Sequence, residues 1–159
     1  MKIILIILTF LIPVMVPSET DVICDCFPLN SKSINGLKSR SDMIAIGKPI
    51  ERIKGESDYE EDMIVFEIDS LIKGSRKIRT ILINQNDAGN CAEYFELCSD
   101  YLITGDEIKN AKSTYRIGQT AHSEKLEKLI NKYYTISTSG CRSFTLKSNL
   151  AKQFLTDKN

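Results

Sequence analysis

The pattern of apolar and polar positions divides the chain into a leader and a longer segment of short elements. Residues 3–16 are almost all apolar and follow the positive charge of Lys2. Val16 and Ser18 are the small residues at the −3 and −1 positions of a cleavage site after Ser18. A charged start, an apolar run of about 14 residues and a polar continuation form a secretory signal, whereas a membrane-spanning helix needs about 20 apolar residues. We therefore predict a signal peptide over 1–18 and a secreted or periplasmic protein. The residues before Cys24 lack the small side chains of a lipid-anchor signal, which favours a free protein over a lipoprotein.

Beyond the leader, short stretches rich in apolar and β-branched residues predict β-strands. We expect these strands at about 42–52, 61–72, 79–83, 100–105 and 134–137. Pro49 within the first strand predicts a bulge or an edge position, because proline cannot donate to a ladder. The sequence Lys73-Gly74-Ser75 predicts the turn that ends the second strand. A further hairpin strand is expected near 115–117.

Two helices and one helical turn complete the expected elements. Apolar residues at 126, 129, 130 and 133 have the spacing of an amphipathic helix that begins after Ser123, and we expect them to pack in the core. Residues 148–155 predict a closing helix, and Ile34 with Leu37 predicts one short helical turn. These elements indicate a single domain of α+β class that is dominated by a β-barrel.

Charge is balanced, with 21 Lys and Arg against 21 Asp and Glu, and loss of Lys2 with the leader leaves a formal charge of −1. No run of like charge exceeds the three residues from Glu60 to Asp62, which predict a solvated turn rather than a calcium site. Nucleic acids and anionic membranes both need a basic face. We therefore expect no nucleic-acid partner and no membrane partner after signal cleavage.

Five cysteines remain after the leader, and in an oxidising compartment they predict disulfides. They are Cys24, Cys26, Cys91, Cys98 and Cys141. An odd number leaves one thiol free or bonded to another molecule. The first two cysteines are too close together to bridge each other easily, so each is expected to reach one of the other three. The sequence has no Cys-x-x-Cys knuckle of the kind that binds zinc, so we expect the protein to bind no metal of its own.

The residues that carry chemistry do not predict an enzyme. His122 is the single histidine, without a second ligand or a triad, and is expected to be a cap or loop residue. No phosphate-binding loop is present, and we expect no cofactor. The aromatic residues Tyr94, Phe95 and Tyr101 have no basic neighbours, so they predict barrel core rather than a base-stacking platform.

One ordered set of motifs resembles a known family. Cys24-Asp25-Cys26-Phe27-Pro28, placed after a signal peptide, resembles the Cys-x-Cys-apolar-Pro start of the tissue inhibitors of metalloproteinases, which contain a netrin-like module. Residues 41–48 and 59–74 are similar to the first two strands of that module. Cys91 to Phe95 with the strand 101–105, and then 136–141 with the following helix, resemble its later parts.

The resemblance implies a disulfide-tied, five-stranded closed barrel of the oligonucleotide/oligosaccharide-binding (OB) type over 24–157, with a short N-terminal helix, a C-terminal helix and a helical insertion at about 109–133. It implies disulfides Cys24–Cys91 and Cys26–Cys141, each adding about 2–4 kcal/mol, and leaves Cys98 unmatched. A bond from Cys24 to Cys98 in place of Cys91 stays open as an alternative.

The function implied is a protein-binding module that inhibits a zinc metallopeptidase through one edge. The residues of that edge are Cys24, Asp25, Cys26, Phe27, Pro28, Gly89 and Asn90. In the family the first cysteine is the mature N-terminus, and its amine and carbonyl bind the target's zinc. Cleavage after Ser18 leaves residues ahead of Cys24, whose nitrogen is then an amide, so Cys24 would contact zinc only if it were N-terminal. Asp25 adds a carboxylate facing the protease's own. The alternative is a non-inhibitory extracellular or envelope interaction domain whose edge residues simply anchor the N-terminus.

Overall fold

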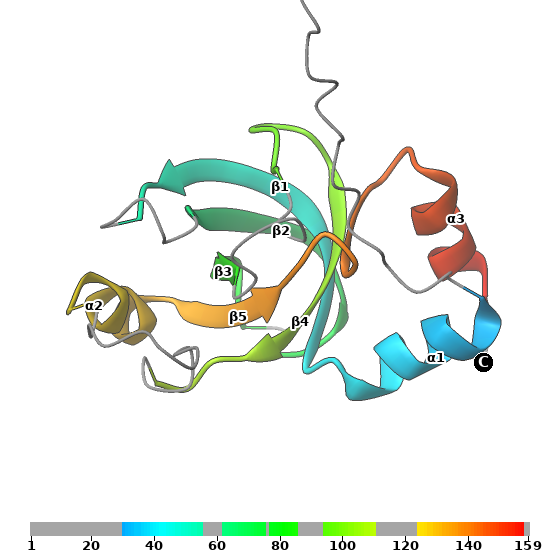
Figure 1. Cartoon of the computed structure of the whole chain (residues 1–159), viewed down its shortest axis with the longest axis horizontal. Coiled ribbons are helices and arrows are strands. Elements are labelled where there is room, and N and C mark those ends of the chain that lie inside the picture. The colour runs from blue at the N-terminus through cyan, green and yellow to red at the C-terminus, as the bar shows by residue number, and fades with distance from the viewer. Residues whose placement is uncertain (1–29, 56–61, 76, 86–93, 111–123, 158–159) are drawn as a thin grey trace, which may run out of the picture.

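Residues 30–55, 62–75, 77–85, 94–110 and 124–157 are described by the structure, a computed structural model. They form a β-barrel flanked by three helices (Figure 1). The strands are β1 (Met43–Ile53), β2 (Met63–Lys73), β3 (Thr80–Gln85), β4 (Tyr101–Glu107), β5 (Tyr134–Thr138) and β6 (Ser143–Thr145). The helices are α1 (Ser31–Arg40), α2 (Glu124–Lys132) and α3 (Asn149–Thr156). None of these helices is long and apolar enough to cross a membrane.

The strand order closes the sheet. The order is β1-β2-β3-β5-β4, and β4 also pairs with β1, so five strands form a closed barrel. The β3–β5 pair is parallel and the other pairs are antiparallel. The predicted β-dominated barrel is therefore confirmed, and its form is consistent with an OB-type fold. The three-residue strand β6, which pairs with β4, is an addition that the sequence pattern did not predict.

Alternating side chains of the strands fill the barrel. On β2, Ile64, Phe66 and Ile68 belong to the interior cluster, whereas Met63 and Val65 belong to a separate cluster on the other face. Phe66 and Ile64 are fully buried. This period of two is the pattern that the predicted second strand carries in its sequence.

Helices cover two parts of the outer barrel surface. The helices α1 and α3 share one cluster with the outer side chains Ile44 and Leu102. On another face, Leu129 and Ile130 of α2, with Tyr133, pack on the cluster that contains Met63, Val65 and Leu82. For these three residues the predicted core role of the amphipathic helix is confirmed. In the chain, α2 lies between β4 and β5, and residues 111–123 of the segment predicted as an insertion lie outside the described residues.

The N-terminal helix is longer than expected. In place of one turn, α1 runs from Ser31 to Arg40. Asn30 is its N-cap: the Asn30 side chain accepts from the Ser33 N–H at 3.0 Å, and the Asn30 N–H donates to the Ser33 hydroxyl at 2.8 Å. This reciprocal capping satisfies two of the unpaired donors at the helix start.

Three register shifts interrupt the pairing of β1 with β2, and the first lies between Ile44 and Ala45. A register shift between Pro49 and Glu51 confirms the bulge that Pro49 predicted. The third shift lies between Ile46 and Gly47, where the backbone of β2 comes so close that a Cβ on Gly47 would lie 2.0 Å from the Glu67 carbonyl oxygen. Gly74, in the predicted turn, has a φ of 128°, a conformation that favours glycine. The expected hairpin strand near 115–117 lies outside the described residues.

Candidate functional site

The edge predicted from the family resemblance falls outside the described residues, and so do His122, Cys91 and the first two residues of the acidic run Glu60–Asp62. The described chain resumes at Tyr94, three residues after Cys91. The segment 94–98 runs beside the last part of β1. We call the surface formed by residues 94–98 with Ile50 and Arg52 the shelf.

Three contacts fix the backbone of the shelf. The Cys98 N–H donates to the Pro49 carbonyl at 2.9 Å, and an Arg52 guanidinium N–H donates to the Phe95 carbonyl at 2.7 Å. The Glu96 N–H donates to the hydroxyl of Tyr101 at 3.0 Å. The segment 94–98 therefore lies along the part of β1 that extends beyond the pairing of β1 with β4. Hydrogen bonds hold this segment near both of its ends.

Neighbouring aromatic residues on the shelf have opposite environments. Phe95 is fully buried and its ring lies 5.0 Å from that of Tyr101, as predicted for core residues. Tyr94 is 79 % exposed, so the prediction that it belongs to the core is wrong. Successive residues of an extended segment point to opposite sides, which sends Tyr94 outward when Phe95 turns inward. The Arg52 guanidinium lies 4.6 Å from the centre of the Tyr94 ring and restrains it.

The shelf includes exposed apolar side chains. Tyr94, Leu97 and Ile50 are three of the six large hydrophobic side chains that are exposed among the described residues. Arg52 adds a positive charge, partly offset by Asp62 at 3.4 Å. Tyrosine and arginine with exposed aliphatic groups are the residue types that protein interfaces enrich.

Cys98 gives the shelf a thiol. It is exposed and free, and its φ of 65° lies in the left-handed region. Cys141 is disulfide-bonded, and its partner lies outside the described residues. Cys24, Cys26 and Cys91 lie outside the described residues, so the thiol that the odd number of cysteines leaves over stays a prediction.

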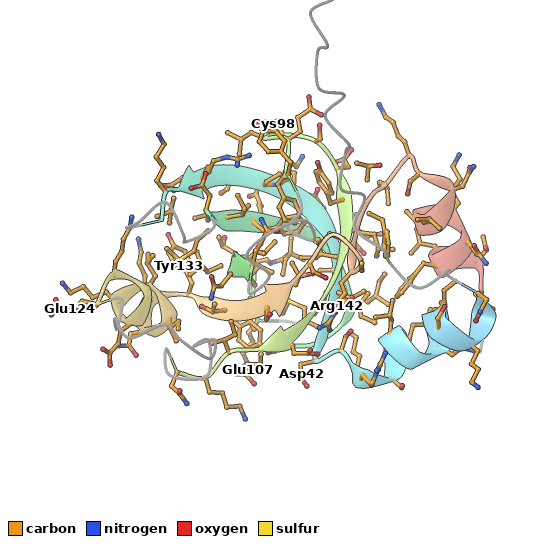
Figure 2. The ribbon with its side chains drawn as sticks, in the orientation of Figure 1. Asp42, Cys98, Glu107, Glu124, Tyr133 and Arg142 are labelled. Atoms are coloured by element: carbon orange, nitrogen blue, oxygen red, sulfur yellow. The ribbon has the colours of Figure 1, made fainter. Side chains whose placement is uncertain are left out.

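A polar cluster lies on the opposite side of the barrel from Cys98 (Figure 2). The Arg142 guanidinium donates to both carboxylate oxygens of Asp106, at 2.5 and 2.9 Å, and to the Ser41 hydroxyl at 3.2 Å. The Asp42 carboxylate accepts from the Glu107 N–H at 2.9 Å. These bonds join the start of β1, the end of β4 and the residue before β6, so the cluster is best explained as structural support.

The pKa values of two groups, Asp106 and Tyr134, are shifted from their ordinary values. Hydrogen bonds from Arg142 hold the pKa of Asp106 below its ordinary value, against the opposing effect of partial burial. Burial raises the pKa of Tyr134, and the negative charges of Glu107 and Asp42 raise it further. No group of three or more His, Cys, Asp or Glu side chains placed to hold a metal ion occurs within the described residues.

Asp106→Asn tests the ion pair through its pH dependence. Because the folded pKa of Asp106 is depressed, its stabilisation is present above the unfolded value of about 3.9 and is lost as the pH falls through the folded pKa. We expect the variant to lose about 1 kcal/mol at neutral pH, a modest value because the side chain is half exposed. Urea unfolding at several pH values should show the two proteins converging in acid.

The matched control is Asp69→Asn, which removes an ion pair with Lys48 that is wider, at 3.7 Å, and whose cation is more exposed than Arg142. This variant is expected to change the free energy of unfolding by less than about 0.5 kcal/mol. An Asp106→Asn deficit that stays constant down to acid pH would contradict the assigned role of the charge.

Comparison with models of known protein families gave no match, and no curated protein matched the chain.

Proposed function

We propose that this chain is an exported protein-binding module of the netrin-like type, and that its partner contacts the shelf. The observation that carries the proposal is the exposed apolar surface of Tyr94, Leu97 and Ile50 on a backbone fixed by hydrogen bonds at both ends. A surface that is already ordered loses less entropy on binding than a mobile one. An aromatic side chain restrained by Arg52 suits the central position of a binding site.

The proposed partner, by family resemblance, is a zinc metallopeptidase. In the netrin-like inhibitors, the segment that corresponds to residues 24–28 lies beside the one that corresponds to residues near Cys91. The shelf begins three residues after Cys91. The proposed site is therefore continuous along the chain with residues 89–91. The alternative is a non-inhibitory interaction domain that uses the same shelf.

We further propose disulfides Cys24–Cys91 and Cys26–Cys141, which would tie the N-terminal segment to the barrel. Support comes from Cys98, which is free, and from Cys141, which is disulfide-bonded. The intact mass of the secreted protein before and after reduction counts the disulfides and also gives the mature N-terminus. Peptide mapping then tests the alternative bond from Cys24 to Cys98.

Inhibition assays against a panel of zinc endopeptidases distinguish the two forms of the proposal. We expect inhibition by protein beginning at Cys24 and its loss when residues 19–23 precede that cysteine, because an amide nitrogen cannot replace the amine at zinc. Tyr94→Ala is expected to weaken inhibition at least about tenfold, as truncation of an aromatic interface residue does.

Matched variants test the position of the binding surface. Leu97→Ser removes an apolar side chain that is 45 % exposed on the shelf, and Ile72→Ser removes one that is 49 % exposed at the end of β2. Only the first should weaken binding. No inhibition by either N-terminal form would reject the peptidase partner and favour the non-inhibitory domain, whereas equal effects of the two serine variants would reject the shelf.

A further inference from the structure

Positive charge is concentrated in two stretches of a chain whose net charge is zero. Residues 30–41 and 138–156 hold six Lys and Arg and no Asp or Glu. These six are Lys32, Lys38, Arg40, Arg142, Lys147 and Lys152. The remaining residues must together carry a formal charge of −6, so the overall balance conceals a strong asymmetry.

The fold brings the two stretches to one end of the molecule. The helices α1 and α3 lie side by side at one end of the long axis, away from α2 (Figure 1). Lys38 of α1 donates to the Asp157 carbonyl at 2.5 Å and lies 5.2 Å from the centre of the Phe154 ring. We call the outer surface of α1 and α3, together with Lys147, the basic end.

Several cations of the basic end are available to a partner. Arg142 is held by Asp106, and Lys38 is engaged with α3. Lys32, Lys147 and Lys152 are exposed, and no ion pair joins them to a carboxylate within the described part of the chain. Their ammonium groups are therefore not held in a close ion pair by a described carboxylate.

Exposed leucines accompany these lysines on α3. Leu150 is 42 % exposed and Leu155 is 43 % exposed, while Ala151 and Phe154 of the same helix are buried in the core. A short helix that displays both leucine and lysine outward has the composition of a surface-lying membrane helix, whose apolar side chains enter the lipid boundary. A polysaccharide or a nucleic acid would attract the lysines but has no apolar phase for the leucines.

We propose that the basic end binds anionic phospholipid surfaces. This inference is independent of the protein-binding function, because it uses a different surface. It departs from the expectation of no membrane partner, which rested on net charge, since an anionic bilayer responds to the charge on the facing surface. Binding at this end places the helices against the bilayer and leaves the shelf on a separate part of the molecule.

Vesicle co-sedimentation of the mature protein tests the proposal. We expect binding to phosphatidylcholine vesicles that contain about one third phosphatidylglycerol, little binding to phosphatidylcholine alone, and weakening by salt. Lys147→Gln with Lys152→Gln should weaken partitioning about 25-fold, because each lysine near an anionic surface contributes about fivefold. Far-ultraviolet circular dichroism confirms that each variant is folded.

Two control variants test whether binding depends on the position of the lysines and on the exposed leucines. Lys109→Gln with Lys128→Gln removes the same charge from exposed positions outside the basic end and should leave binding within about twofold of the parent. Equal losses in the two double variants, or no preference for anionic vesicles, would overturn the proposal. Leu150→Gln with Leu155→Gln should weaken vesicle binding but not retention on a soluble polyanion such as dextran sulfate. Unchanged vesicle binding by that variant would favour a polysaccharide or nucleic acid in place of lipid.

Discussion

Replacement of Gly47 by alanine is expected to destabilise the barrel by about 3 kcal/mol or more, the upper range for overpacking a core. The added Cβ would lie 2.0 Å from the Glu67 carbonyl oxygen and 2.8 Å from the Phe66 ring. The first neighbour is backbone within a paired strand, so relief requires β1 and β2 to move apart. Urea unfolding followed by circular dichroism measures the loss.

Gly36→Ala is the matched control, because it adds the same methyl group inside α1. The nearest atom to that methyl is the Arg40 guanidinium at 3.8 Å, which is an ordinary contact. Alanine favours a helix interior over glycine, so this variant should gain up to about 1 kcal/mol. A Gly47→Ala protein as stable as Gly36→Ala would show that the close approach of β1 to β2 is not required.

Phe95→Ala is expected to cost about 3–5 kcal/mol, as for other large-to-small changes at fully buried aromatic sites. The ring is fully buried and packs on Tyr101, which in turn accepts the Glu96 N–H. Its loss should therefore also loosen the backbone of the shelf. Hydrogen exchange of the Glu96 and Cys98 amides provides a direct measurement of that loosening.

The adjacent Tyr94→Ala is the control for this change. Tyr94 is mostly exposed and interacts chiefly with Arg52, so its truncation should cost less than about 1 kcal/mol. A large stability loss in Tyr94→Ala, or a small loss in Phe95→Ala, would reverse the assignment of core and surface at these two positions.

The strands were predictable because their apolar residues alternate over enough positions to define a face. Ile64, Phe66 and Ile68 show this in β2. The strand β6 has only three residues and forms by pairing with β4. Pairing with a distant strand cannot be predicted from the local sequence pattern. The helix α1 was underestimated because Gly36 and few apolar residues weaken its pattern. Its readable signal was Asn30 followed by Ser33, the two partners of the capping box.

The shelf and the basic end were harder to predict for different reasons. Tyr94 and Phe95 are adjacent aromatic residues, and composition does not say which one turns inward; that choice depends on contacts with Tyr101 and Arg52. The asymmetry of charge was present in the sequence, but only the packing of α1 beside α3 brings Lys32 and Lys152 to one end of the molecule.

The parallel pairing of β3 with β5 determines when the barrel can close. Ile81 pairs with Tyr134, so a chain that ends before β5 leaves β3 and β4 each with one unpaired edge. Contacts this far apart in sequence form slowly, because a long loop must close first. A polypeptide that crosses a membrane N-terminus first could not complete the barrel, and so could still be threaded, until β5, which begins at Tyr134, had emerged.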